Sequence, residues 1–191
     1  MDISVFGLGY VGSVTAACLA SQGHKVVGVD VNADKVQAIN SGQSPVVEPG
    51  LDHLIGNAVR VGNLSATQDA VAAVTHGDIS LICVGTPSNS TGSVSLEYVE
   101  RVCAEIGCAL AGMQIYKVVA LRSTVLPGTL SNCLIPILTE ESGKRVGVDF
   151  GAAVNPEFLR EGSAIEDFEN PPFTLIGQVD KRAGDVLAAL Y

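Results

Sequence analysis

The segment from Gly7 to Gly12, Gly-Leu-Gly-Tyr-Val-Gly, constrains the fold more than any other part of the sequence. It directly follows a short apolar run, residues 3–6, and opens a helical pattern that reaches about residue 21. In such a strand-turn-helix unit Gly7 permits a tight turn, Gly9 lets a pyrophosphate approach the backbone, and Gly12 lets the helix pack on the sheet. The segment therefore predicts a dinucleotide site at a helix N-terminus, where N–H groups and the helix dipole favour phosphate. A glycine turn without a ligand is the alternative.

Short apolar runs alternate with helical patterns along the chain, which is typical of a parallel sheet with crossover helices. The fold class predicted is α/β, a doubly wound parallel sheet of Rossmann type, with residues 1–191 in one dinucleotide-binding domain. The last residues, 186–191, form a helical pattern with no glycine stop, which predicts that the chain belongs to a longer protein. Further strands are expected at 26–29, 64–67, 79–84, 117–121, 148–154 and 174–176, and further helices at 33–40, 51–59, 96–110 and 127–141.

Composition narrows the class of protein. The chain has 191 residues, of which 47% are hydrophobic, which suits one packed domain. A net charge of −9 disfavours nucleic acid as a partner. Apolar stretches are too short for a membrane span and no leader is visible, so the expected location is the cytoplasm. The five cysteines stand mostly in apolar contexts and are expected to be buried free thiols, and no metal site is expected because metal-type spacing is lacking.

Asp30 ends the predicted second strand, 18 residues beyond Gly12. A carboxylate at this place accepts hydrogen bonds from the adenosine ribose and repels a 2′-phosphate, so NAD is favoured over NADP. Lys35 is near enough in sequence to assist at the ribose, or it is a solvated lysine. The alternative for Asp30 is an N-cap on the helix that begins at Ala33.

Two threonines follow predicted central strands, Thr86 after residues 79–84 and Thr124 after residues 117–121. The carboxyl ends of both strands face the ligand crevice in a doubly wound sheet, so both hydroxyls are expected to meet the cofactor, with Thr124 nearer the nicotinamide. Turn and cap chemistry is the alternative.

The segment Asn155 to Gly162, Asn-Pro-Glu-Phe-Leu-Arg-Glu-Gly, carries two carboxylates. We expect Pro156 to begin a helical turn in which Glu157 and Glu161 share one face. A buried carboxylate there can do general acid–base work, whereas an exposed one only interacts favourably with the helix dipole.

Five ordered segments together resemble the UDP-glucose/GDP-mannose dehydrogenase family. Within that family, residues 44–51 and 86–98 are most similar to the members that act on GDP-mannose. The five segments read Phe-Gly-Leu-Gly-Tyr-Val-Gly at 6–12, Val-Glu-Pro-Gly-Leu at 47–51, Cys-Val-Gly-Thr-Pro at 83–87, Arg-Ser-Thr-Val-Leu-Pro-Gly-Thr at 122–129, and Asn-Pro-Glu-Phe-Leu-Arg-Glu-Gly at 155–162.

The resemblance implies a reaction and a set of roles. The family oxidises the C6 alcohol of a nucleotide-linked sugar to a carboxylate with two NAD⁺, traps an aldehyde stage on a cysteine and hydrolyses the thioester; with GDP-mannose the product is GDP-mannuronate, which supplies alginate-type polysaccharides. Thr124 would also help to hold a water, Glu157 would be the base for thioester hydrolysis, and Glu161 would contact the sugar. Main chain of Phe158, Leu159 and Arg160 would line the sugar. Contacts with NAD are implied for Tyr10, Val11, Asp30, Lys35, Thr86 and Thr124.

One departure limits what the chain is expected to do alone. The nucleophile of the family lies in a Gly-Gly-Ser-Cys-Leu-Pro-Lys-Asp block, and none of the five cysteines stands in such a block. The resemblance thus predicts the NAD-binding part of a homo-oligomeric enzyme, not competent by itself. Another nucleotide-sugar 6-dehydrogenase such as one acting on UDP-glucose, a short-chain β-hydroxyacid dehydrogenase, and a stand-alone NAD-binding module remain alternatives.

Overall fold

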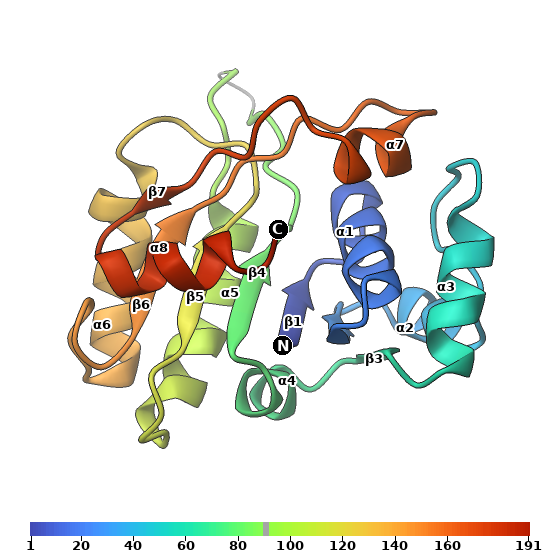
Figure 1. Ribbon diagram of the computed structural model, residues 1–191. Helices are drawn as coiled ribbons and strands as arrows, with labels where there is room; N and C mark the ends of the chain where they lie inside the picture. Colours follow the sequence, from blue (N-terminus) through green and yellow to red (C-terminus); the bar gives the residue numbers. More distant parts are fainter. Residues whose placement is uncertain (90–91) are drawn as a thin grey trace.

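A seven-stranded sheet forms the centre of the computed structural model, which describes residues 1–89 and 92–191 (Figure 1). The strand order is β3-β2-β1-β4-β5-β6-β7; neighbouring strands run parallel except β7, which is antiparallel to β6. The predicted doubly wound α/β fold is therefore confirmed. The strands are β1 (Asp2–Phe6), β2 (Lys25–Val29), β3 (Leu64–Thr67), β4 (Ile79–Ile82), β5 (Val118–Leu121), β6 (Gly151–Val154) and β7 (Gly177–Gln178).

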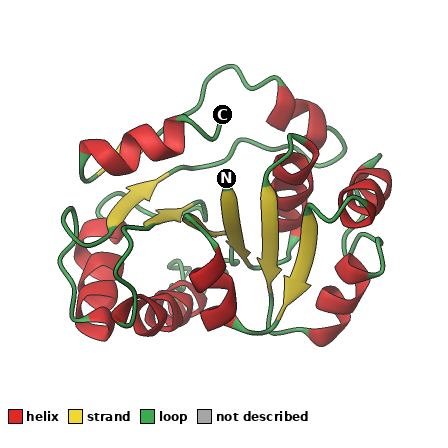
Figure 2. Ribbon diagram, turned by 60° about the horizontal axis from the view of Figure 1, so that its bottom comes forward, coloured by secondary structure: helices red, strands yellow, loops and turns green. Residues whose placement is uncertain are grey.

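Helices cover both faces of the sheet, as Figure 2 shows. One face carries α1 (Tyr10–Ser21), α2 (Ala33–Asn40), α3 (Leu51–Arg60), α7 (Ala164–Glu169) and α8 (Lys181–Ala188). The other carries α4 (Ala70–His76), α5 (Glu97–Ala111), the π-helical turn η1 (Leu130–Leu134) and α6 (Ile135–Ser142). Each face has its own apolar core. Among the described helices, none has the length and apolar character needed to cross a membrane.

Strand β1 lies between β2 and β4, so the chain winds first toward one edge of the sheet and then toward the other. At this switch point the loops after β1 and β4 turn to opposite faces and leave a crevice at the carboxyl ends of the strands. The glycine turn, Gly7 to Gly12, follows β1 and opens directly into α1. The fold thus places the predicted dinucleotide segment at the ligand crevice.

Three predicted elements clearly differ from the structure, and two helices, α4 and α7, were not predicted. The Asp69 carboxylate caps α4 by accepting from the Ala72 N–H at 2.9 Å. The helix expected at 127–141 begins with η1, because Pro136 has no N–H to donate into a continuous α-helix. The strand expected at 148–154 is only Gly151–Val154, since residues 145–149 form a turn closed by Asp149. The last strand lies at 177–178 rather than 174–176.

Candidate functional site

The three glycines of the glycine turn have different physical requirements. Gly7 adopts a φ of +95°, a left-handed conformation that favours glycine. A Cβ at Gly12 would lie 1.7 Å from the Gly7 carbonyl oxygen, so only glycine fits there. A Cβ at Gly9 would meet no atom within 4 Å. The chain itself needs Gly7 and Gly12, whereas the open space beside Gly9 is available to a ligand, as the predicted roles require.

A cleft of about 260 Å³ lies beside this turn. Its walls include Gly7 and Gly9 from the glycine turn, Asp30 and Lys35 from the region after β2, and Gly85 from the loop after β4. The cleft therefore joins the ends of β1, β2 and β4, which is where a doubly wound sheet binds a dinucleotide.

Asp30 is one of the charged groups that line this cleft, together with Lys35, Arg101 and Glu105. Its carboxylate accepts hydrogen bonds from the Leu8 N–H at 2.7 Å and the Asn32 N–H at 2.9 Å, and the Lys35 ammonium lies 3.5 Å away. The N-cap alternative for Asp30 is wrong, because Asn32 caps α2 by accepting from the Asp34 N–H at 2.8 Å. A carboxylate has about four acceptor sites, so Asp30 retains capacity for a ribose hydroxyl.

Tyr10 and Val11 occupy the first two positions of α1, where N–H groups have no acceptor within the helix. The Tyr10 hydroxyl is already engaged, since it donates to Glu48 at 2.5 Å and approaches the Arg160 carbonyl oxygen at 3.4 Å. A cofactor contact from Tyr10 would therefore come from its main chain, together with the Val11 N–H.

Thr86 and Thr124 lie together, as the strand order predicts. The Thr86 hydroxyl donates to the main-chain carbonyl of Thr124 at 2.8 Å, which ties the loop after β4 to the loop after β5. Neither residue lines the cleft beside the glycine turn, and the Thr124 side chain is exposed. Their position suits the part of a dinucleotide farther from Asp30.

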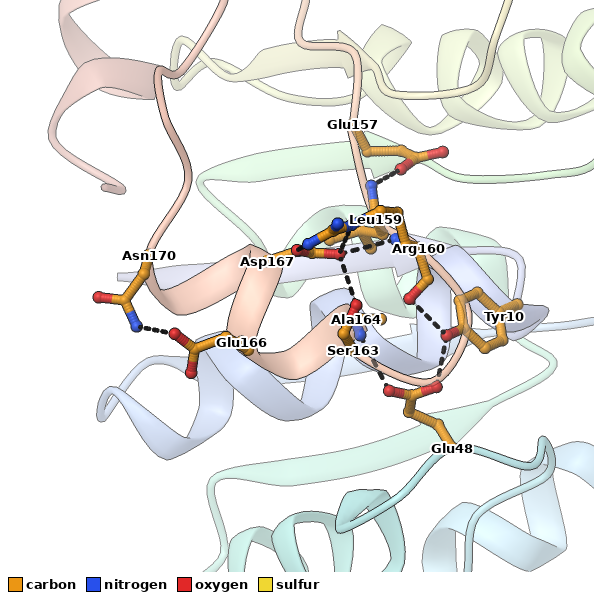
Figure 3. A network of polar contacts seen from close by, with 10 residues as sticks. All are labelled: Tyr10, Glu48, Glu157, Leu159, Arg160, Ser163, Ala164, Glu166, Asp167 and Asn170. Atoms are coloured by element: carbon orange, nitrogen blue, oxygen red, sulfur yellow. Dashed lines mark hydrogen bonds and ion pairs between the residues drawn. The ribbon is translucent and has the colours of Figure 1, made fainter.

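The segment from Asn155 to Arg160 is not helical, so the predicted shared face of Glu157 and Glu161 is wrong. The Glu157 carboxylate accepts from the Leu159 N–H at 2.5 Å, and this local bond replaces the helical pattern that Pro156 was expected to begin (Figure 3). One oxygen of Glu157 closes the turn and the other points away from it (Figure 3).

Arg160 and Asp167 hold the following residues against α7. The guanidinium lies 2.6 Å from the carboxylate, and the Arg160 N–H donates to the same group at 2.9 Å. These bonds lower the pKa of Asp167 to about 2, and the bond from the Arg160 side chain has the largest effect. Phe158 is half exposed and packs edge-on against Phe173, with ring centroids 5.1 Å apart. Main chain at 158–160 is thus fixed in a nonhelical course.

Glu48 is a polar residue of the site that sequence reasoning did not single out. It is only 7% exposed, and it accepts from the Tyr10 hydroxyl, the Gly162 N–H at 2.8 Å and the Ala164 N–H at 2.9 Å. Burial alone would raise the pKa of Glu48, but these three hydrogen bonds hold it below its ordinary value. Its one signal in the sequence was a glutamate within the unusually apolar loop 41–50.

The cysteines are all free, as expected. Burial raises the pKa of Cys18, Cys83 and Cys103 to about 12, which leaves these thiols protonated and poor nucleophiles. Cys133 is half buried, and Cys108 is exposed, contrary to the expected burial. Cys83 lines the cleft, where it serves as a small apolar wall.

Comparison with known proteins gives concordant similarities. Residues 1–191 match the model of the UDP-glucose/GDP-mannose dehydrogenase family, NAD binding domain. The chain is 54% identical to GDP-mannose 6-dehydrogenase of Pseudomonas syringae pv. syringae over 191 residues, which are 100% of the chain and 44% of that protein. A crystal structure of a ternary complex of GDP-mannose dehydrogenase from Pseudomonas aeruginosa superposes with a TM-score of 0.99 at 52% identity, over 100% of this chain and 44% of that one.

A second solved structure extends the similarity to another substrate class. It is a UDP-glucose dehydrogenase from Pyrobaculum islandicum, with a TM-score of 0.94 and 43% identity over 99% of this chain and 43% of that chain. The chain thus spans less than half the length of the relatives it matches.

Proposed function

Since this chain belongs to the UDP-glucose/GDP-mannose dehydrogenase family and is its NAD-binding domain, we propose that it serves an enzyme that oxidises GDP-mannose to GDP-mannuronate. The observation that carries the proposal is the cleft at the sheet's switch point, with Gly9 open on one side and Asp30 on the other. The higher identity to a GDP-mannose enzyme, 54%, than to a UDP-glucose enzyme, 43%, favours GDP-mannose. Another nucleotide sugar is the alternative.

The residues around the cleft fit NAD. The open space at Gly9 and the first N–H groups of α1 suit the pyrophosphate, and the Asp30 carboxylate with Lys35 suits the adenosine ribose. Thr86 and Thr124 would meet the nicotinamide end. Bound NAD⁺ supplies the hydride acceptor, while these residues hold and orient it.

Residues 157–161 form the proposed sugar side. Glu157 would take a proton from the water that hydrolyses the thioester, Thr124 would help to hold that water, and Glu161 would contact the sugar. Main chain from Phe158 to Arg160 would line the same ligand. Support comes from the nonhelical course of this segment, which the bonds to Glu157 and Asp167 fix and in which main-chain groups make no helical hydrogen bonds.

The complete enzyme is proposed to contain a further part that carries the nucleophilic cysteine and the nucleotide pocket. The low reactivity expected of the three buried thiols here agrees with a nucleophile placed elsewhere. The enzyme is proposed to be a cytoplasmic homo-oligomer that supplies a uronate for alginate-type polysaccharide.

In the full-length enzyme we expect kcat/KM for GDP-mannose to exceed that for UDP-glucose by at least about 100-fold. The reason is that a pocket built for one nucleotide base has unpaired polar groups when the wrong base occupies it. Each GDP-mannose should yield two NADH, measured by absorbance together with chromatography of the product. A higher kcat/KM for UDP-glucose would assign the enzyme to the alternative substrate class, and equal values would contradict the proposed preference for GDP-mannose. Binding of NAD⁺ without oxidation of any nucleotide sugar would favour a stand-alone NAD-binding module.

Removal of the Asp30 carboxylate should reduce the preference for NAD⁺ over NADP⁺. Titration calorimetry on this chain should give at least about tenfold tighter binding of NAD⁺, or about 1.4 kcal/mol, because the carboxylate repels a 2′-phosphate. Asp30→Ala should weaken the binding of NAD⁺ and narrow the difference in affinity between NAD⁺ and NADP⁺. Asp34→Ala, which removes an exposed charge from the first turn of α2, is the matched control and should leave the preference intact. If the wild type bound both cofactors equally, the role proposed for Asp30 would be wrong.

A further inference from the structure

We propose that Glu48 is a positioning residue that fixes the sugar-side main chain to the first turn of α1, so that the cofactor and sugar sites keep one relative geometry. This inference rests on the function proposed above. Glu48 comes from the loop between α2 and α3, whereas its partners come from α1 and from the loop before α7. It touches neither the 260 Å³ cleft nor any of the atoms proposed to react.

The two oxygens of the Glu48 carboxylate accept hydrogen bonds from different donors. Oε2 accepts from the Tyr10 hydroxyl at 2.5 Å and from the Gly162 N–H at 2.8 Å, and Oε1 accepts from the Ala164 N–H at 2.9 Å. Figure 3 shows the carboxylate between Tyr10 and the turn that leads into α7. A single buried group thus holds a side chain of α1 and two main-chain amides, Gly162 in the loop before α7 and Ala164 at the first position of α7.

The site specifies a carboxylate rather than any polar side chain. All three partners donate, and an ionised carboxylate is an acceptor only. A glutamine in this place would direct its NH₂ group at the Ala164 N–H in one orientation and at the Gly162 N–H in the other. Either way one buried N–H loses its acceptor and meets another donor, so the amide cannot reproduce the contacts.

Among the described residues, the other polar contacts of the segment do not duplicate this link, although α7 also packs on α1 through apolar side chains such as Ala164 and Phe168. The Arg160–Asp167 pair and the bond from the Ser163 hydroxyl to Asp167 at 3.2 Å join the segment to α7. The link to α1 consists of Glu48 with Tyr10, whose hydroxyl also lies 3.4 Å from the Arg160 carbonyl oxygen. Tyr10 follows Gly9, so the same turn of helix carries the proposed pyrophosphate contact and the anchor of the sugar side.

Kinetics of the full-length enzyme would test the proposal. Glu48→Gln should lower kcat/KM for GDP-mannose by about 10- to 100-fold, since a shift of about 1 Å in positioned groups has effects of this size. Its affinity for NAD⁺ should stay within about threefold, less than 0.7 kcal/mol, because the groups proposed to bind the cofactor are retained. Glu166→Gln is the matched control: it makes the same change on α7, where the carboxylate is exposed and bonds only to Asn170, and should keep wild-type kinetics.

Hydrogen exchange gives a readout that does not depend on activity. In the 191-residue chain, Glu48→Gln should speed exchange of the Gly162 and Ala164 amides at least about tenfold over Glu166→Gln, because their acceptor is lost. Wild-type enzyme that oxidises no sugar would overturn the proposed function, while the exchange result would still test the anchor. Unchanged exchange would overturn the anchor.

A purely structural role predicts a different pattern, in which NAD⁺ affinity, thermal stability and turnover fall together; that result would also overturn the proposal. If Glu48→Gln does not fold, Tyr10→Phe replaces it, since this change removes the hydroxyl that contacts Glu48 and the Arg160 carbonyl oxygen and leaves the bonds from Glu48 to the Gly162 and Ala164 amides. Tyr10→Phe should lower kcat/KM for GDP-mannose about threefold or more, because the loss of one hydrogen bond corresponds to about 0.7 kcal/mol. The affinity for NAD⁺ should be retained. Wild-type kinetics in Tyr10→Phe would contradict the link to α1.

Discussion

Gly9→Val is expected to abolish binding of NAD⁺ to this chain without unfolding it. Gly9 adopts an extended conformation, φ −78° and ψ −164°, which a β-branched residue accepts readily, and its Cβ would meet no protein atom within 4 Å. The added methyl groups would occupy the space that a pyrophosphate needs beside the N-terminus of α1. Affinity should fall by at least about 100-fold, or about 2.7 kcal/mol.

Gly12→Ala provides the contrasting variant. Its Cβ would stand 1.7 Å from the Gly7 carbonyl oxygen, so this smaller change should lower the melting temperature, whereas Gly9→Val should leave it near the wild-type value. Calorimetric titration with NAD⁺ and thermal unfolding of both variants would separate the two effects. Normal NAD⁺ binding by a folded Gly9→Val variant would mean that the glycine turn has no ligand.

Glu157→Gln in the full-length enzyme is expected to slow hydrolysis of the thioester by about 10²–10⁴-fold, the usual contribution of a general base. The first hydride transfer should change much less. The geometry supports this separation, because an amide oxygen can still accept from the Leu159 N–H and so preserve the turn. What the amide cannot do is take a proton from water.

The effect on thioester hydrolysis would be measured by rapid quench after the enzyme is mixed with GDP-mannose and NAD⁺. The amount of covalent enzyme that accumulates is compared with the size of the NADH burst. Glu161→Gln is the comparison, since a sugar contact should act on KM or on both steps together. If Glu157→Gln turned over at the wild-type rate and no covalent species accumulated, the proposed role as a base would be wrong. Glu157 would then serve only to close the turn at Leu159.

Local signals explain why so much of the fold was predictable. Helix α1 occupies the predicted range, because the glycine turn fixes its start and polar residues follow its end. The central strands are continuous apolar runs, as strands covered on both faces must be. The cofactor side of the site follows from the same rules, since strand ends and a switch point place Asp30, Thr86 and Thr124 without knowledge of side-chain contacts.

The proposed sugar side could not be predicted in the same way, because its course depends on side-chain bonds to main-chain amides, both local ones and one from Glu48, which is 114 residues away from Gly162. Glu157 and Glu161 have helical spacing, yet the segment is pinned by Asp167 and by Glu48. The interpretation of Tyr10 also changed, since its side chain serves Glu48 and only its main chain remains for the cofactor. A buried carboxylate whose three donors lie on other elements leaves no periodic pattern to detect.

The central place of β1 in the sheet has a consequence for how the chain folds during synthesis. Ile3 pairs with Val26 on one side and with Ile79 on the other. The emerging chain can therefore assemble β1, β2 and β3 early, while the second edge of β1 stays open to wrong partners until β4 leaves the ribosome. The crevice is complete only after α5 has followed, because Tyr98 and Arg101 of that helix also line it. NAD⁺ can then stabilise the completed sheet by mass action, but it gives no such help to the half-sheet that is made first.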